Sequence, residues 1–275
     1  MKTKYIILLT LFVLITGSCS EIIDIGINAS DAQLVVEAKM PQDATAMVIL
    51  TRSVNFYDSL LVPAVTDATV VISDDAGNSE ILTMTSPGLY QSINLTGKVG
   101  RKYSLSIHTK DEHITSESLI PAPVPIDTVY AVNSIYPGGG PPILPGQRAD
   151  FFEVYVKYTD PAFEQNFYRI ILYINGKASP RLYIYDDRLN NGNQVENLHV
   201  VYDPELKDGD KIVVEMQCID KRVYEYYKSM GNSSMGPRNA TSPANPYTNL
   251  LGAILGYFSA HTVDRKDITL VRYKP

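Results

Sequence analysis

Histidine and acidic residues in the first half of the chain are the first candidates for metal chemistry. His108 and His113 flank a short turn that has Asp111 and Glu112 at its tip. The surrounding alternation predicts a hairpin with both imidazoles on its polar face, about 7 to 8 Å apart as diagonal neighbours. Glu117 could supply a third ligand, but no metal motif of recognised spacing is present. We therefore interpret the two histidines as exposed residues on a solvated sheet, and we expect neither a metal nor a cofactor.

The later of the two cysteines is the first candidate for nucleophilic chemistry. Cys218 ends a run in which Ile212, Val214 and Met216 alternate with other residues, so the pattern predicts a strand with the thiol on its apolar face. A buried thiol of this kind is inert. His199 and His261 stand alone in the sequence, and we interpret both as structural.

The remaining polar residues of the sequence form neither a calcium-binding loop nor a known enzyme motif. Asp74 with Asp75, and Asp208 with Asp210, lack the spaced oxygen ligands of a calcium loop and are interpreted as hairpin turns. The chain has no Gly-x-Ser-x-Gly elbow, His-Glu-x-x-His helix, phosphate loop or dinucleotide fingerprint. We therefore expect no catalytic residues. A hydrolase that uses two facing carboxylates remains the alternative, because 30 acidic residues are available.

Aromatic platforms for sugars are a further alternative, although the chain has no tryptophan. Several tyrosines could serve, but cross-strand and interior packing is the interpretation that we prefer for them. They are Tyr155, Tyr168, Tyr173, Tyr183 and Tyr185.

The first twenty residues, MKTKYIILLTLFVLITGSCS, have the pattern of a lipoprotein signal peptide. Lys2 and Lys4 form a positive start, the apolar run 5–15 is too short to span a bilayer, and small residues precede Cys19. We predict a signal peptide over 1–18 and lipid attachment at Cys19. An ordinary secretory signal is the alternative. No later apolar run approaches spanning length, so the lipid would be the sole membrane anchor.

Charge and composition restrict the class of partner. The chain has 24 basic and 30 acidic residues, and loss of the signal peptide changes its formal charge from −6 to about −8. This acidic balance argues against nucleic acid as a partner. The 19 tyrosines and 17 prolines suit short strands joined by turns.

The elements that would position these residues are mainly strands, so the predicted fold class is all-β. A lipid anchor and tether covers 19–32, and about seven strands predict an immunoglobulin-like β-sandwich over 33–120. A proline-rich linker over 121–127 leads to a second β-rich domain over 128–275.

The second domain is predicted to contain one short helix and to end in strands. Asp220 would be the N-cap of the helix and Gly231 its stop. The last two strands are placed at 255–263 and 268–273. Irregular loops over 137–146 and 232–249 are candidate partner-binding segments, and their candidate residues are Ile143, Leu144, Asn245 and Tyr247.

Several blocks together resemble one family of Bacteroidetes envelope lipoproteins, the domain-of-unknown-function 4249 family, over essentially the whole chain. They are the lipid cysteine with Glu21 to Ile25, LVVEA at 34–38, VVISDDAGNSE at 70–80, PGLY at 87–90, GRKYSL at 100–105, PANP at 243–246 with Asn249, and GAILGYFSA at 252–260 ahead of Arg265.

The resemblance implies no activity and no catalytic residues, but it implies a cellular location and a class of partner. Members of the family look like partners of TonB-dependent outer-membrane transporters. The expectation is therefore a non-enzymatic, outer-membrane-anchored lipoprotein that acts as a binding or accessory subunit of a TonB-dependent nutrient uptake system. The face of the membrane, cell surface or periplasmic, stays open. An architectural or adhesion subunit of the envelope is the alternative beside the surface hydrolase.

Overall fold

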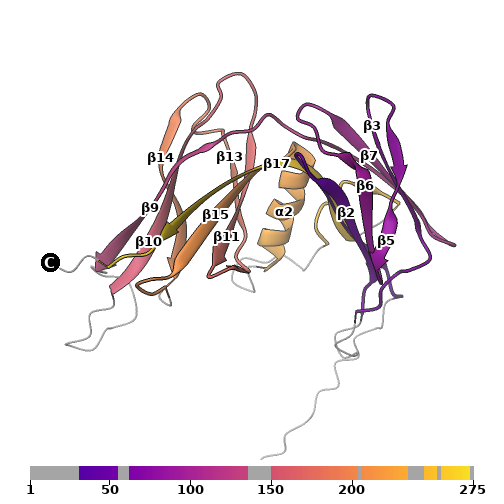
Figure 1. Ribbon diagram of the computed structural model, residues 1–275, viewed down its shortest axis with the longest axis horizontal. Coiled ribbons are helices and arrows are strands. Elements are labelled where there is room, and N and C mark those ends of the chain that lie inside the picture. The colour runs from indigo at the N-terminus through magenta and orange to yellow at the C-terminus, as the bar shows by residue number, and fades with distance from the viewer. Residues whose placement is uncertain are drawn as a thin grey trace, which may run out of the picture. The chain divides into compact units, whose positions relative to one another are not determined.

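The structure is a computed structural model that describes residues 31–54, 62–135, 150–203, 206–234, 245–252 and 255–272. From Ala32 onward the chain forms one compact unit. Its described strands build two β-sandwiches that share one long strand, β17 (Figure 1).

The first sandwich contains two sheets that face each other around one apolar core. The strands of one sheet, besides part of β17, are β1 (Leu34–Pro41), β2 (Thr45–Arg52), β6 (Leu89–Thr96) and β5 (Thr83–Ser86). The strands of the other are β16 (Leu250–Leu251), β8 (His113–Leu119), β7 (Lys102–His108), β3 (Thr69–Asp74) and β4 (Ser79–Ile81).

Alternation in the sequence explains how these strands form the first core. Along β1, Leu34, Val36, Ala38 and Met40 are buried while the residues between them face outward, because successive side chains of a strand point to opposite faces. The same alternation in β7 buries Tyr103, Leu105 and Ile107. Each fully buried aliphatic side chain stabilises the fold by about 1.5 to 3 kcal/mol.

The second sandwich packs a three-stranded sheet against the other end of the large sheet. The three strands are β14 (Gln194–Asp203), β10 (Asp150–Thr159) and β9 (Ile126–Ile135). They face β15 (Lys211–Cys218) and β11 (Phe167–Ile174), which pairs with β12 (Lys177–Ala178) and β13 (Tyr183–Asp186). The second core includes Phe152, Tyr168 and Cys218.

Strand β17 (Leu255–Thr269) joins the two sandwiches by changing its partner along its length. Residues 255–261 pair in parallel with β1, and residues 262–269 pair antiparallel with β15. The prediction of two separate final strands was wrong. The charged residues 264–267 between the two predicted strands lie within β17. Arg265 forms an ion pair with Glu215 opposite it, and the Asp264 carboxylate accepts the Ile126 N–H.

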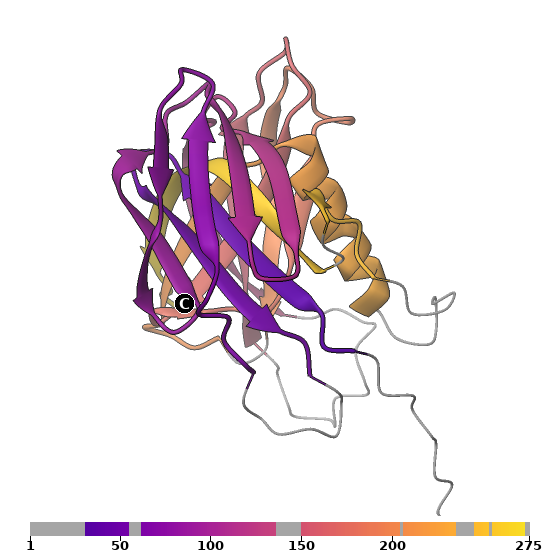
Figure 2. The ribbon, with the colours of Figure 1, turned by 90° about the vertical axis from the view of Figure 1, so that its right-hand side faces the viewer.

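Helix α2 (Lys221–Ser234) packs on the large sheet, where it contacts β11, β13 and β17, and Figure 2 shows it to the right of the strands. The predicted N-cap is confirmed, since the Asp220 carboxylate accepts the Val223 N–H at 3.0 Å. The predicted stop at Gly231 was wrong, because the helix continues for three more residues. Val223, Tyr224 and Tyr227 pack against Tyr257 and Phe167 of the sheet. In the described ranges, no helical segment has the length and apolar character needed to cross a bilayer.

The all-β prediction is confirmed: the fold is mainly β, with a sandwich first and a second β-rich part that carries α2. The domain boundaries at 120 and 128 stay a prediction. Strand β9 begins at Ile126, inside the predicted linker, and β17 carries residues of the second predicted domain into the sheet of the first.

Candidate functional site

A cleft of about 460 Å³, here called the junction cleft, lies where the segment after β8 passes α2 and the loop before β11. Leu119, Ile120 and Ile219 give it an apolar lining, while Glu164 and Lys221 bring charge to it. A second hollow of about 220 Å³ is lined partly by the same Leu119 and Lys221. Apolar walls with a few charged groups are typical of ligand and peptide sites.

A half-buried carboxylate closes one side of the junction cleft. Asp220 receives a short hydrogen bond from the Ser118 hydroxyl of β8, and its other oxygen caps α2. Burial raises the pKa of Asp220, and it outweighs the hydrogen bonds that favour the charged form. Ser118 also accepts the Ala260 N–H of β17 at 2.8 Å. This wall of the cleft is therefore tied to β8, β17 and α2 together.

The loops 160–166 and 187–193 are fastened to each other beside the cleft by two buried aspartates. Asp160 is 2 % exposed; it accepts the hydroxyl of Tyr168 and, at 3.2 Å, the Gly192 N–H. Asp187 is 3 % exposed and accepts the Asn166 N–H at 2.8 Å. Buried carboxylates are costly unless they are hydrogen-bonded in this way, so both loops are held in one conformation.

These fastened loops carry two large apolar side chains into solvent. Phe163 is 98 % exposed and Leu189 is 93 % exposed, and we call this pair the apolar tips. Because the loop is hydrogen-bonded in place, covering such a residue costs less backbone entropy than it would on a free loop. The sequence analysis missed the apolar tips. The available signal was an aromatic residue inside an otherwise polar loop after the Asp160-Pro161 turn.

Buried polar residues on the outer face of the large sheet could suggest catalysis. Glu215 is 3 % exposed, and its carboxylate accepts hydrogen bonds from Gln217, from Tyr173 and twice from Arg265. Arg169 lies over the Tyr227 ring at 4.3 Å. Glu215 is thus held by neighbours on β11, β15 and β17, which stabilises the sheet beneath α2.

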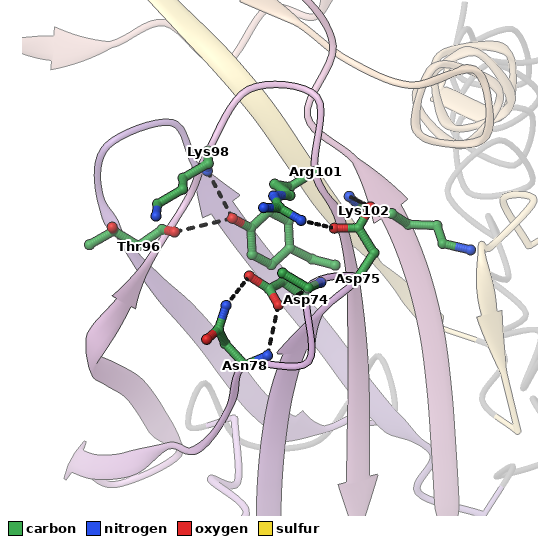
Figure 3. A network of polar contacts seen from close by, with 9 residues as sticks. Asp74, Asp75, Asn78, Thr96, Lys98, Arg101 and Lys102 are labelled. Carbon is green, nitrogen blue, oxygen red and sulfur yellow. Dashed lines mark hydrogen bonds and ion pairs between the residues drawn. The ribbon is translucent and has the colours of Figure 1, made fainter.

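The hairpin between β3 and β4 holds a second group of acidic residues (Figure 3). Burial opposes ionisation of Asp74, but hydrogen bonds from Asn78 and Ala76 outweigh it and lower the pKa of Asp74. Glu80 accepts the N–H groups of residues 93, 94 and 95, and these likewise outweigh burial and lower its pKa. A polar hollow of about 340 Å³ lies beside both. The turn interpretation of Asp74 agrees with these contacts.

The second pair of acids that resembled a calcium loop also serves a turn. A hydrogen bond from Asn175 and one from the Lys207 N–H lower the pKa of Asp210, and Asp208 accepts the Arg272 N–H at 2.6 Å. Both carboxylates hold the chain around Gly209, which has a positive φ.

The two candidate histidines for a metal lie closer together than the sequence indicated. His108 and His113 are directly opposite each other in the β7–β8 pairing, and their ring centroids are 4.0 Å apart. Glu117 does not join them, because it forms an ion pair with Lys102 at 3.2 Å. The described residues contain no group of three or more His, Cys, Asp or Glu suited to a metal ion.

The other residues considered for chemistry lie in packed surroundings. Cys218 is buried in the second core as predicted, and burial raises the pKa of its thiol. His261 is also buried, with Nδ1 beside Ser259. Tyr168 is buried, and Tyr155 stacks across strands on Tyr130 at 5.3 Å, so both agree with the packing interpretation. The side chain of His199 is outside the described residues.

The predicted partner-binding residues are only partly visible in the structure. Ile143 and Leu144, like the lipid-attachment candidate Cys19, lie outside the described residues. Asn245 and Tyr247 are exposed, and the Tyr247 N–H donates to the Ser229 hydroxyl of α2 at 2.8 Å. Asn249 is instead buried and clamps β17, because its side-chain amide bonds both the N–H and the carbonyl of Phe258.

The fold and the site together define a class: a two-sandwich β protein whose buried polar residues hold its strands and loops, and whose surface offers a cleft beside exposed apolar tips. Within that class, the chain belongs to the family described as Domain of unknown function (DUF4249), whose model matches residues 20–267. The family resemblance of the sequence is thereby confirmed. A search of curated proteins gives no match to this chain.

Proposed function

We propose that this protein is a non-enzymatic lipoprotein of the outer membrane that acts as a binding or accessory subunit of a TonB-dependent nutrient uptake system. The observation that carries the binding role is the pair of exposed apolar tips on loops that are hydrogen-bonded to each other, one of which lines the junction cleft. The signal-like N-terminus supports the envelope location, and the family resemblance supports a transporter as the partner.

The binding role is favoured over the hydrolase alternative by the state of the acidic residues. A carboxylate pair for glycoside hydrolysis must face a cleft and leave one group able to donate a proton. Glu215, Asp160 and Asp187 are buried and hydrogen-bonded to the chain, and Glu80 is held by three backbone N–H groups. These contacts suit structural carboxylates better than catalytic ones.

The anchor is tested by replacing Cys19 with alanine in the full-length protein. We expect the variant to move from the membrane fraction to the soluble fraction, because one cysteine carries the whole lipid attachment. Membrane retention equal to that of the wild type would contradict the anchor.

The binding surface is tested by the double substitution Phe163→Ser and Leu189→Ser, with co-purification of outer-membrane barrels as the measurement. We expect at least a tenfold loss of the recovered barrel, since two central apolar contacts are each worth about 1 to 2 kcal/mol. The matched control is Ile93→Ser, because Ile93 is a 68 % exposed apolar residue of the first sandwich. Equal recovery with all variants would refute this surface.

A further inference from the structure

The exposed hairpin between β7 and β8 places two imidazoles in the closest arrangement that a sheet allows. Thr109 and Glu112 form the hydrogen-bonded pair at its end, since the Thr109 N–H donates to the Glu112 carbonyl at 2.9 Å. The next pair, His108 and His113, is therefore a non-hydrogen-bonded pair, in which opposing side chains approach most closely. Their rings are stacked at 4.0 Å with 19° between their planes.

The nitrogens of this pair are accessible and carry few contacts. Both histidines are exposed on the outer face of the sheet. His113 Nε2 lies 3.3 Å from the Ser106 hydroxyl oxygen, which is long for a hydrogen bond. A neutral imidazole nitrogen with a free lone pair is the commonest protein ligand for transition metals.

The backbone beneath the two rings is fixed from both sides. Seven consecutive residue pairs join β7 to β8. Arg52 of β2 holds Glu112 in the turn through two hydrogen bonds, at 3.1 and 2.7 Å. On the far side of β8, a Cβ built on Gly252 would lie 2.3 Å from the His113 carbonyl oxygen, so that backbone packs directly behind it. The backbone at the two histidines is thus fixed before any ligand arrives, which lowers the entropic cost of chelation. The stacked rings have their nitrogen lone pairs in nearly parallel planes, so each side chain must turn about its own χ angles to direct a nitrogen at a shared ion.

We propose that His108 and His113 form a bidentate site for a borderline divalent transition metal, with Cu²⁺ preferred over Ni²⁺ and Zn²⁺. Nitrogen ligands suit these ions, and the order follows their general affinity for such ligands. Ca²⁺ and Mg²⁺ are disfavoured because they require oxygen ligands. With two protein ligands, the remaining coordination positions are left to water or to a chelating group that accompanies the metal. This inference is independent of the proposed transporter role.

The test is calorimetric titration of the full-length protein in detergent with CuCl₂, NiCl₂ and ZnCl₂. We expect one saturable site in the wild type, and at least a tenfold weaker affinity in each of His108→Gln and His113→Gln. The double variant should lose little more affinity than either single variant, because one remaining imidazole binds the metal only as a weak monodentate ligand. His199→Gln is the matched control and should bind as the wild type does.

Two results would overturn the proposal. One is the absence of saturable binding in the wild type. The other is binding by either single variant within about twofold of the wild type, which would indicate independent surface histidines rather than a chelate. Thermal melts check that the variants are folded. Both side chains are exposed, so neither substitution should lower the melting temperature.

Discussion

Gly256 is the residue where the structure tolerates a side chain least. It has a φ of +107° and lies opposite Val36 in the parallel pairing of β17 with β1. A Cβ built there would lie 1.9 Å from the Val36 carbonyl oxygen. Backbone conformation and close approach therefore both require glycine at this position.

Gly256→Ala should lower the free energy of unfolding by at least about 3 kcal/mol, from strain in φ together with a clash against backbone. Chemical denaturation measures the loss. Gly209→Ala is the matched control, because Gly209 also has a positive φ but a Cβ there would meet nothing within 4 Å. It should cost only about 1 kcal/mol. Equal losses in the two variants would contradict the role of the β1–β17 approach.

His261 gives the fold a defined dependence on pH. Burial lowers the pKa of His261 to about 4; a hydrogen bond to the Ser259 carbonyl and the charge of Glu215 oppose the shift, while Arg169 and Lys39 add to it. The unfolded chain binds this proton near pH 6.5, so the folded state is fully stabilised above pH 6.5 and loses stability as the pH falls toward 4.

Between pH 7.5 and pH 5 this single group should remove about 2 kcal/mol from the free energy of unfolding. Denaturation curves of the wild type and of His261→Gln at several pH values isolate its contribution. The variant should be less stable at pH 7.5 and show a flatter dependence over this interval. Parallel curves for the two proteins would show that His261 is not the titrating group.

At the residue scale, the sequence predicted burial better than contact. Alternation placed Cys218 in the core and turn composition placed Asp74 in a hairpin turn, because strand periodicity and turn chemistry are local properties. The sequence predicted His108 and His113 as diagonal neighbours, whereas they lie directly opposite each other. The register of a hairpin depends on which turn residues form the last hydrogen bond, and here they are Thr109 and Glu112. Nothing local indicated that Asp160 and Asp187 would be buried and would fix two loops.

At the scale of elements, the start of α2 connects the two sandwiches. Asp220 serves as the N-cap of α2 and also as the acceptor for Ser118 of β8. The N-cap was predictable from sequence, because an aspartate precedes an amphipathic run. Its second partner was not, since Ser118 lies 102 residues earlier in the chain.

Asp220→Ala should destabilise the protein by about 2 to 4 kcal/mol, because it removes a helix cap and leaves the buried Ser118 hydroxyl without this acceptor. Asp220→Asn keeps one oxygen for the cap and offers its amide N–H to the Ser118 hydroxyl oxygen in place of the second oxygen. It also lacks the charge whose desolvation raises the pKa of the aspartate. We therefore expect the asparagine variant to stay within about 1 kcal/mol of the wild type at pH 7. Thermal and denaturant unfolding distinguish the two, and an equal loss in both variants would assign the effect to the charge itself.

Strand β17 is the element that sequence patterns described least well. Its charged stretch over 264–267 looks like a break because exposed strands and turns share the same composition. Contacts with other strands make these charges compatible with a strand: Arg265 pairs with Glu215 and Asp267 with Lys211, both on β15, and Asp264 accepts the Ile126 N–H of β9. Contacts with residues that are distant in sequence therefore make β17 one continuous strand.

At the scale of the whole molecule, the first sandwich depends on residues from the end of the chain. Phe258 and Ala260 of β17 are buried in the first core, together with Leu250 of β16. A fragment of residues 33–120 would lack all three and would expose the edge of β1. The predicted domain boundary at 120 can be tested on this basis.

The fragment 33–120 should be at least about 3 kcal/mol less stable than the same sandwich in the full chain, which is the usual cost of removing one buried phenylalanine. Circular dichroism and urea unfolding measure this. Fusing residues 245–262 to the fragment through a flexible linker should restore most of the loss. A fragment that unfolds at the same urea concentration as the full-length protein would establish 33–120 as an independent domain.

The shared strand also determines the order in which the molecule can fold. Val35 pairs with Leu255, so the parallel partner of β1 is synthesised about 220 residues after β1 itself. Contacts this distant in sequence slow folding and leave strand edges open in the meantime. In pulsed hydrogen exchange during refolding, we expect the amides of β1 that bond to β17 to gain protection only as β15 and β17 do. The first strand that the structure describes is then among the last to reach its native pairing.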